Sequence, residues 1–373
     1  MKVMSVFGTR PEAIKMAPLV KKLNEDPFFE SVLCVTAQHR EMLDQVLELF
    51  DLKPDYDLNL MKPNQTLSMI TAGVLTGLEP VLEKEAPDMV LVHGDTSTTF
   101  SAALAAFYRK IPVGHVEAGL RTYDMYSPFP EEVNRVLTGH MASLHFAPTQ
   151  RNRENLMKEG IEADKIFVTG NTVVDALLQV AEKPYEFEDE TLKSIDFDRK
   201  RVIAVTCHRR ENLGTYMRQI FEAIREIAEE FEDVEVVYPV HMNPKVRETA
   251  SEVFGGCGNV HLIEPLSYQP FVNLMARSYF IVTDSGGMQE EAPSLGKPVL
   301  VVRKETERPE AVKAGTVKLA GVERETIAAL ARELLTDRAA YEAMAHASNP
   351  YGDGTACDKI LEALKWQKTQ NRR

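Results

Sequence analysis

Residues 278–302 read SYFIVTDSGGMQEEAPSLGKPVLVV, in which two apolar runs enclose a helix-compatible run. Residues 279–283 are apolar and rich in β-formers, which predicts a buried strand. Residues 288–295 suit a helix, and residues 298–302 predict the next strand. This order is typical of a parallel sheet that carries helices on its faces.

The turn between the first strand and the helix contains Ser285, Gly286 and Gly287. Backbone N–H groups point outward where a strand's carboxyl end meets a helix's amino end, and the helix dipole adds to their attraction for a phosphate. Glu290 and Glu291 follow one turn later, where a carboxylate suits the hydroxyls of a ribose. The alternative interpretation is an ordinary capped helix with Asp284 or Ser285 as N-cap.

The same alternation of β-rich runs and amphipathic segments continues along the whole chain in two series. The first series has strands at 2–7, 31–36, 88–93, 111–116, 142–146 and 165–168. The second has strands at 201–206, 234–238, 260–263, 279–283 and 298–302, with helices near 214–231, 243–253 and 267–277. We therefore expect an α/β protein of two doubly wound Rossmann-like domains, with a ligand in the cleft that their strand ends face.

The domain boundaries follow from breaks in this pattern. A chain of 373 residues exceeds one ordinary core, because domains average about 150 residues. Residues 1–182 are the predicted first domain, and the charged, aperiodic segment 183–200 is the predicted linker. Residues 201–354 form the predicted second domain, and residues 355–373 contain a last helix.

Charge and composition exclude several classes of partner. The net charge of −13 argues against a nucleic-acid or membrane-surface partner, which would select for basic stripes. The apolar run at the start is too short for a secretion signal, and no stretch reaches the ~18 apolar residues of a membrane span, so we expect a cytoplasmic protein. The four cysteines form no C-x-x-C pair, and neither a Walker loop nor a nicotinamide fingerprint occurs, so we expect neither a metal nor a cofactor.

Charged residues follow the strands of the first domain where each strand ends. Arg10 follows the first strand, with Lys15 one helical turn later, while Asp95 and Glu117 follow the strands at 88–93 and 111–116. Carboxylates clustered at one sheet edge are candidates for proton transfer, because burial and mutual repulsion raise the pKa of one of them. For Asp95 the alternative to a catalytic role is a structural role as a helix N-cap. For Glu117 the sequence suggests no structural role.

Two further pieces join this cluster. In SPFPEEVNRVL, Glu131 begins a helix and Arg135 lies four residues later, which as an alternative predicts an ordinary helix-stabilising pair. In the second domain the strand at 201–206 runs into CHRRENLG, which places His208 and Arg209 at a strand end. A histidine beside arginines suits a diphosphate.

Together these blocks resemble the bacterial family of non-hydrolysing UDP-N-acetylglucosamine 2-epimerases, nearly from end to end. The matching blocks are GTRPEAIKMAP, HGDTSTT, HVEAGLRT, PEEVNR, GNTVVD, HRRENLG, DSGGMQEEAP and NPYGDG. The resemblance implies a GT-B-type architecture whose last helix crosses back to the first domain. It also implies epimerisation without a cofactor: UDP leaves UDP-N-acetylglucosamine to give 2-acetamidoglucal and then re-adds, which yields UDP-N-acetylmannosamine for cell-envelope polysaccharides.

The resemblance also implies roles for single residues. The implied catalytic residues are Asp95, Glu117, Glu131 and His208. The implied ligand contacts are Arg10, Lys15, Arg135, Arg209, Ser285, Gly286, Gly287, Glu291 and Arg308, with Phe271 beside the uracil. Gln38 and His39, and Gln65 as a further candidate, lie near the site where a second substrate molecule activates many family members. A homodimer is also expected.

Two kinds of alternative remain at this point. One is another enzyme of the same architecture, either a hydrolysing epimerase or a retaining glycosyltransferase. The other is a nucleotide-sugar sensor without catalysis. The three acids of the first domain, Asp95, Glu117 and Glu131, argue against a sensor, since binding UDP needs only the second domain.

Overall fold

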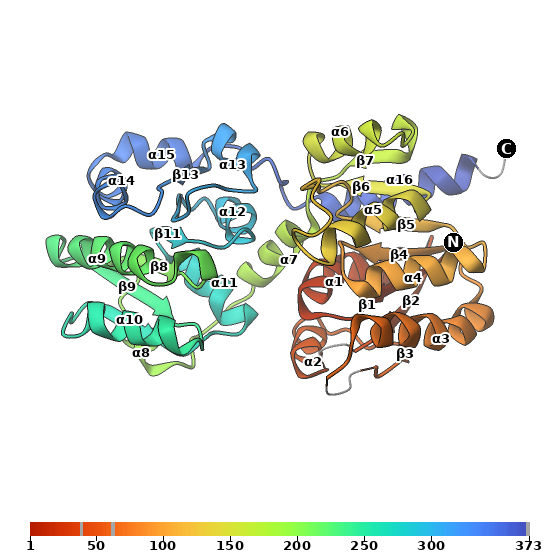
Figure 1. The fold of residues 1–373 in the computed structure, drawn as a ribbon, viewed down its shortest axis with the longest axis horizontal. Coiled ribbons are helices and arrows are strands. Elements are labelled where there is room, and N and C mark those ends of the chain that lie inside the picture. The colour runs from red at the N-terminus through yellow and green to blue at the C-terminus, as the bar shows by residue number, and fades with distance from the viewer. Residues whose placement is uncertain (38–39, 61–63, 371–373) are drawn as a thin grey trace. The chain divides into compact units, whose positions relative to one another are not determined.

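The structure is a computed structural model that describes residues 1–37, 40–60 and 64–370. The chain divides into two compact units, each built on its own sheet (Figure 1). Unit 1 comprises Met1–Ala176 and Tyr351–Arg373, and unit 2 comprises Leu177–Pro350. The predicted activator residues Gln38 and His39 lie outside the described residues.

The sheet of unit 1 is parallel, with strand order β3-β2-β1-β4-β5-β6-β7. Its strands are β1 (Lys2–Phe7), β2 (Glu30–Val35), β3 (Tyr56–Asp57), β4 (Met89–His93), β5 (Val113–Val116), β6 (Leu144–Ala147) and β7 (Ile166–Val168). The chain builds outward from β1 to β3 and then returns to the other side of β1 with β4. The loops after β1 and β4 therefore diverge at a topological switch point, which is where open α/β sheets bind ligands.

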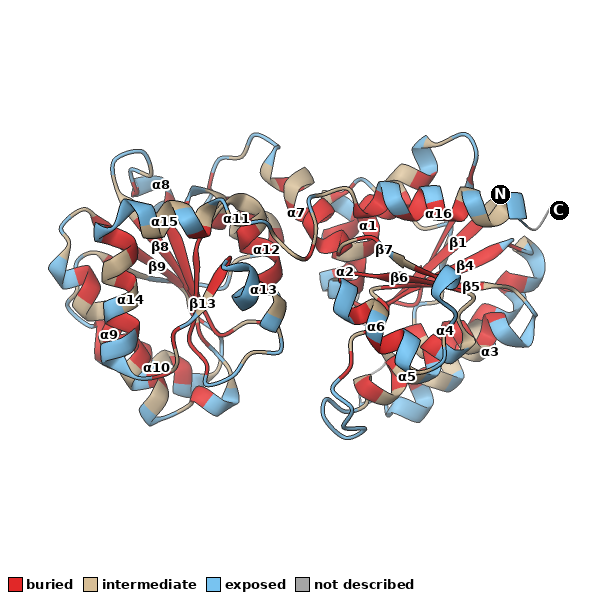
Figure 2. Cartoon of the chain, turned by 90° about the horizontal axis from the view of Figure 1, so that it is seen from above, coloured by how far each residue is buried: buried red, intermediate tan, exposed pale blue. Residues whose placement is uncertain are grey.

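Helices cover both faces of this sheet (Figure 2). They are α1 (Arg10–Glu25), α2 (Arg40–Leu49), α3 (Leu67–Glu85), α4 (Ser97–Tyr108), α5 (Glu131–Met141), α6 (Gln150–Lys158), α7 (Thr172–Ala181) and α16 (Ala356–Gln370). Helix α1 packs against α2 and α16, while α4 packs between α3 and α5. The boundary between the units falls within α7.

Unit 2 repeats the plan with the parallel order β10-β9-β8-β11-β12-β13. Its strands are β8 (Arg201–Thr206), β9 (Val234–Pro239), β10 (Val260–Ile263), β11 (Phe280–Thr283), β12 (Val299–Val301) and β13 (Val317–Leu319). Its helices are α8 (Glu190–Ser194), α9 (Thr215–Glu230), α10 (Pro244–Phe254), α11 (Tyr268–Arg277), α12 (Met288–Glu291), α13 (Pro309–Ala314), α14 (Arg324–Thr336) and α15 (Arg338–Ala345). The switch point here lies between the neighbouring strands β8 and β11. The block HRRENLG follows β8 and the block DSGGMQEEAP follows β11.

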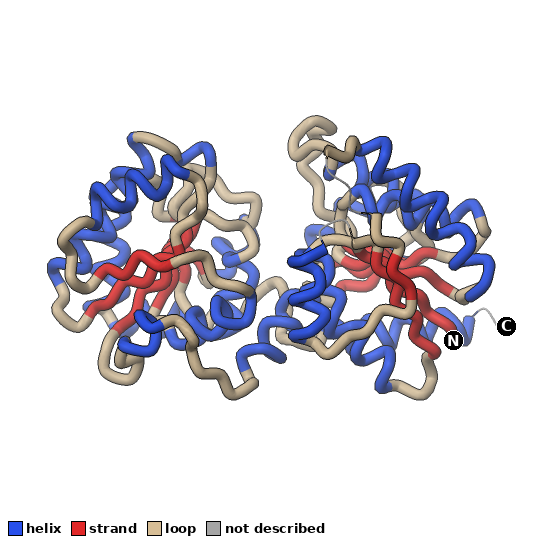
Figure 3. The backbone as a smooth tube through the Cα atoms, turned by 90° about the horizontal axis from the view of Figure 1, so that it is seen from below, coloured by secondary structure: helices blue, strands red, loops and turns tan. Residues whose placement is uncertain are grey.

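The predicted fold class of two doubly wound α/β units is confirmed. In both units the strands form the centre and the helices lie outside them (Figure 3). Three predicted strands match the observed bounds at both ends: β1, β8 and β10. The sequence did not reveal β3 and β13, which are short strands at the sheet edges.

The last helix, α16, packs on unit 1. Its buried face contributes Ile360 and Leu364, and Lys365 forms an ion pair at 2.6 Å with Asp26 after α1. Apolar burial stabilises this contact more than the exposed ion pair does, because such pairs contribute about 1 kcal/mol or less. In the parts of the chain that are described, no helix combines the length and apolar character needed to span a membrane.

Candidate active site

Glu12 ties together the two loops at the switch point of unit 1. Its buried carboxylate accepts hydrogen bonds from the backbone N–H groups of Gly8 at 3.1 Å and Thr9 at 2.8 Å, in the loop after β1. It also accepts the hydroxyls of Thr96 at 2.7 Å and Thr99 at 3.1 Å, at the start of α4. The sequence analysis missed this residue. The signal was present in the pattern T-x-x-E of a capping box.

Glu117 lies directly after β5 in a strained conformation. Its φ of 61° falls in the left-handed region, which costs a non-glycine residue about 1 kcal/mol or more. Its carboxylate accepts hydrogen bonds from the Lys15 ammonium and from Asn171 Nδ2, the latter at 2.8 Å. His93 Nε2 lies 3.8 Å from the same oxygen. Lys15, predicted as a ligand contact, is therefore also a partner of the predicted catalytic acid.

The surroundings of Glu117 keep it ionised. Burial alone would raise the pKa of Glu117, but the charge of Lys15 and the hydrogen bonds from Lys15 and Asn171 outweigh burial and hold the pKa well below its usual range. Burial lowers the pKa of His93 to about 4, so this neighbour is a neutral imidazole near pH 7. Glu117 is thus an acceptor-only carboxylate at neutral pH.

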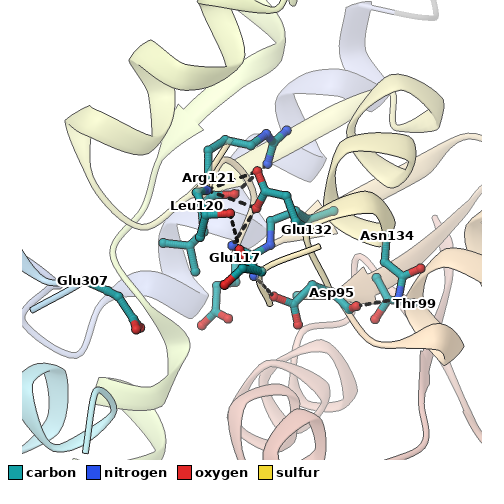
Figure 4. A network of polar contacts seen from close by, with 12 residues as sticks. Asp95, Thr99, Glu117, Leu120, Arg121, Glu132, Asn134 and Glu307 are labelled. Carbon is teal, nitrogen blue, oxygen red and sulfur yellow. Dashed lines mark hydrogen bonds and ion pairs between the residues drawn. The ribbon is translucent and has the colours of Figure 1, made fainter. Parts of the chain in front are cut away.

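Asp95 has the opposite balance, although it belongs to the same polar network (Figure 4). Burial raises the pKa of Asp95 to about 6; Arg135 opposes the shift and the charge of Glu117 adds to it. The alternative role of Asp95 as an N-cap is wrong, because the hydroxyl of Thr96 caps α4. Two neighbouring carboxyl groups with pKa values pushed apart are typical of an acid and base pair.

Helix α5 holds Asp95 in place. Arg135 Nη2 lies 2.8 Å from Asp95 Oδ2. Asn134 Nδ2 donates to the Asp95 carbonyl at 2.9 Å (Figure 4). Arg135 also pairs with the buried Glu132 at 3.3 Å. The alternative of a surface pair with Glu131 is therefore wrong, because Arg135 is buried and points to other acids. Glu131 itself is half-buried at the first position of α5.

In unit 2, Asp284 joins the loops that follow β8 and β11. Its fully buried carboxylate accepts the backbone N–H groups of His208 and Arg209, each at 2.8 Å, and the side-chain amide of Asn212 at 3.1 Å. Asp284 therefore does not cap α12, and the N-cap position belongs to Gly287. His208 Nδ1 lies 3.7 Å from Asp284 Oδ1, and burial lowers the pKa of His208.

The predicted phosphate turn follows β11. Helix α12 is only four residues long and continues as a 3₁₀ turn at Ala292–Leu295, so the predicted helix is split. A side chain at Gly286 would meet Arg209 Nη2 at 3.8 Å, and one at Gly287 would meet Glu291 Oε1 at 3.1 Å. The contact at Gly286 would be ordinary van der Waals spacing, whereas the one at Gly287 would be tight, so Gly287 is the position where a side chain would crowd Glu291.

The remaining predicted residues of unit 2 lie at two other helices, α13 after the turn and α11 before it. Arg308, at the start of α13, forms an ion pair with the buried carboxylate of Glu290. Phe271 lies in the first turns of α11 and is half-buried. The sequence did not reveal that Glu290 pairs with Arg308, because this contact depends on how the loop after β12 folds back.

Two predicted residues lie elsewhere in unit 1. Arg10 is the first residue of α1 and is half-buried. Gln65 precedes α3, and its side-chain amide donates to the Leu60 carbonyl at 2.5 Å. Within the described ranges, no group of three or more His, Cys, Asp or Glu side chains is arranged to hold a metal ion.

Comparison with known proteins shows relatives that match nearly the whole length of this chain. The family model described as UDP-N-acetylglucosamine 2-epimerase matches residues 21–365. The chain belongs to this family. It is 58% identical over 373 residues to the UDP-N-acetylglucosamine 2-epimerase of Escherichia coli K12, with 98% of each chain covered. The family resemblance seen in the sequence is thereby confirmed, and the family is one of isomerases.

Solved structures of other family members agree with this assignment. A crystal structure from Listeria monocytogenes is 54% identical, has a TM-score of 0.94 and covers 99% of this chain and 97% of that chain. The UDP-GlcNAc 2-epimerase of Neisseria meningitidis, solved bound to UDP-GlcNAc, is 54% identical with a TM-score of 0.85. That match covers 98% of this chain and 100% of the other.

Proposed function

We propose that this chain interconverts UDP-N-acetylglucosamine and UDP-N-acetylmannosamine. The observation that carries the proposal is the pair Asp95 and Glu117, two carboxyl groups in one network whose pKa values are pushed in opposite directions. An inversion at C2 needs one group that takes a proton and another that returns one to the opposite face. Family membership and the relative bound to UDP-GlcNAc support the choice of substrate.

The proposed reaction proceeds by elimination and re-addition. The C2–H bond and the C1–O bond to the diphosphate break, a C1–C2 double bond forms, and the products held by the enzyme are 2-acetamidoglucal and UDP. A diphosphate oxygen then re-forms the bond to C1, and C2 takes a proton on its other face. The steps balance without an oxidant or reductant.

The acids of unit 1 carry the proton transfers in this proposal. Asp95, with a pKa of about 6, can exchange a proton near neutral pH, whereas Glu117 stays ionised and accepts hydrogen bonds. Glu131 is the third acid. Arg10 and Lys15 are proposed to add positive charge near the departing diphosphate.

Unit 2 is proposed to hold UDP. The diphosphate would lie at the turn Ser285–Gly287 with His208 and Arg209, which Asp284 positions. Glu291 would accept from the ribose hydroxyls, with Arg308 as a further ligand contact and Phe271 beside the uracil.

The fate of UDP-N-acetylglucosamine in D₂O, followed by NMR, tests the function. We expect a UDP-N-acetylmannosamine signal with deuterium at C2, because the proton that is removed is not the one that is returned. Free sugar plus UDP would instead identify a hydrolysing epimerase. Retention of the original C2 hydrogen in the product would exclude elimination, and unchanged substrate would favour a sensor.

Regulation and use of the product belong to the same proposal. We expect a cytoplasmic homodimer that is activated by a second substrate molecule near Gln38, His39 and Gln65. Its product would be used for cell-envelope polysaccharides. The rate should depend sigmoidally on UDP-N-acetylglucosamine. The reverse reaction should stall with rigorously purified UDP-N-acetylmannosamine, and a reverse reaction that runs freely would exclude the activation.

A further inference from the structure

Asn171 contacts Glu117 directly, although it was part of a sequence block without a role. Its Nδ2 donates to Glu117 Oε2 at 2.8 Å, and its Oδ1 accepts the backbone N–H of Val173 at 3.2 Å. The second contact fixes the orientation of the amide, because only the oxygen can accept from Val173. The NH₂ group must then face Glu117. Only 3% of Asn171 is exposed, so the side chain has little freedom.

The C-terminal segment that returns to unit 1 holds the backbone of Asn171. The N–H of Asn171 donates to the Tyr351 carbonyl at 2.6 Å. The backbones of Gly170 and Gly352 cross so closely that a Cβ at Gly352 would lie 3.3 Å from Gly170 Cα. Both glycines have positive φ values, 89° and 126°, so neither position readily accepts another residue. The return of the chain after unit 2 thus sets the position of Asn171.

Helix capping alone does not explain an asparagine here. The oxygen that accepts from Val173 at the start of α7 could equally belong to Asp or Ser, which are as common as Asn at such positions. Aspartate would place a second carboxylate against Glu117, and serine has no donor long enough to reach it. Asparagine offers both a capping oxygen and an uncharged donor.

We propose that Asn171 is a positioning residue for the epimerisation, which fixes the direction of the Glu117 carboxylate and is itself fixed by the C-terminal return at Tyr351 and Gly352. This inference rests on the proposed function. It gives the block GNTVVD and the block NPYGDG a shared purpose: Asn171 of the first block contacts the strained Glu117, and Tyr351 and Gly352 of the second block contact Asn171 and Gly170.

The groups that face Glu117 predict how loss of Asn171 would act. Lys15 approaches from α1, His93 from β4 and His115 from β5, while Asp95 lies in the loop after β4. Burial lowers the pKa values of His93 and His115 to about 4 each, so near pH 7 both are neutral. Without the amide of Asn171, Glu117 would keep Lys15 but lose a donor that favours its ionised form.

The test uses Asn171→Ser and Asn171→Asp, both of which keep an oxygen for the N–H of Val173. We expect Asn171→Ser to lower kcat by about 10- to 100-fold with KM changed by less than about threefold, the scale of a lost hydrogen bond to a charged group. Asn171→Asp should act more strongly and move the acidic limb of the kcat profile to higher pH. The added negative charge raises the pKa of Glu117 and also that of Asp95, the acid of this network that titrates near pH 6.

Asn152→Asp is the matched control. It also introduces a carboxylate at a buried asparagine of unit 1, but the Asn152 side chain serves the N-cap Thr149 of α6. We expect the kcat of this control to stay within about twofold of the parent value. Its acidic limb should stay within about a few tenths of a pH unit of the parent.

Three outcomes are informative. A fall in kcat with a shifted acidic limb and parental UDP affinity supports the proposal. Parental kcat and pH profile in both Asn171 variants would overturn it, as would equal losses in Asn152→Asp. If thermal stability and kcat fall together and the acidic limb stays in place, Asn171 is merely structural. A parent protein that does not epimerise at all would instead refute the proposed function.

Discussion

Arg135 Nη2 lies 2.8 Å from Asp95 Oδ2, which joins helix α5 to the loop after β4. The spacing within the PEEVNR block predicts that Arg135 pairs with Glu131, but in the structure Arg135 pairs with Asp95. The charge of Arg135 opposes the effect of burial on Asp95, and after burial it is the largest influence on the pKa of Asp95, ahead of the charges of Glu117, Lys15 and Glu131.

Removing either central carboxylate should separate chemistry from nucleotide binding. We expect Glu117→Gln and Asp95→Asn each to slow turnover by about two orders of magnitude or more, the scale of lost general acid and base catalysis. UDP affinity, measured by calorimetry, should stay within a few-fold of the parent. Asp164→Asn, an exposed change in the same unit, is the control. Parental turnover in both variants would refute the assignment of these acids.

Replacing Arg135 should move the titration of Asp95. In Arg135→Gln the cation that lowers the pKa of Asp95 most is lost, so the limb of the kcat/KM profile near pH 6 should shift to higher pH. We also expect a loss of about 3 kcal/mol in unfolding free energy, the low end for a broken buried pair, because 27% of the Asp95 side chain is exposed. A variant with weakened substrate binding and an unmoved limb would identify Arg135 as a ligand contact instead.

The raised pKa of Asp95 also predicts how stability depends on pH. Because burial raises the pKa of Asp95 from an ordinary 3.8 to about 6, folding favours the protonated acid. The contribution of this group is fully present below the ordinary pKa and is lost as pH rises through about 6. We expect Asp95→Asn to gain stability relative to the parent on going from pH 4 to pH 7, as measured by urea unfolding. An unchanged difference between the two pH values would contradict the raised pKa.

Asp284→Ala should release the loop that carries His208. Three donors lose a buried carboxylate, so we expect a loss of about 2–3 kcal/mol in unfolding free energy. Asp337→Ala in the same unit also removes two backbone hydrogen bonds, but at an exposed N-cap of α15, and should cost about 1 kcal/mol. Equal effects in urea unfolding would show that burial of Asp284 adds nothing.

Glu291→Ala should weaken UDP binding. We expect a loss of about 1.5–3 kcal/mol by calorimetry, as for a lost hydrogen bond to a charged group. Glu248→Ala, at an exposed position of α10, serves as the control and should bind UDP like the parent. Unchanged UDP affinity in Glu291→Ala would count against placing the ribose at this carboxylate.

The sequence by itself determined the two series of strands and the family. Central strands of a parallel sheet are buried on both faces, so they appear as apolar, β-rich runs such as 2–7 and 201–206. The charged blocks at their carboxyl ends pointed to the candidate site, because parallel strands bring those ends to one edge. The edge strands β3 and β13 gave no such signal, since they are short and partly exposed.

Only the tertiary structure decided which of the charged residues contact one another. Glu12, Asp284 and Asn171 each link loops or segments that are distant in sequence, and their partners depend on the order in which the strands pair. The opposite pKa shifts of Asp95 and Glu117 likewise require knowledge of burial and of which cation lies beside which acid. Local spacing favoured a pair between Arg135 and Glu131, but packing turned the guanidinium inward, where a buried charge is stable only against carboxylates.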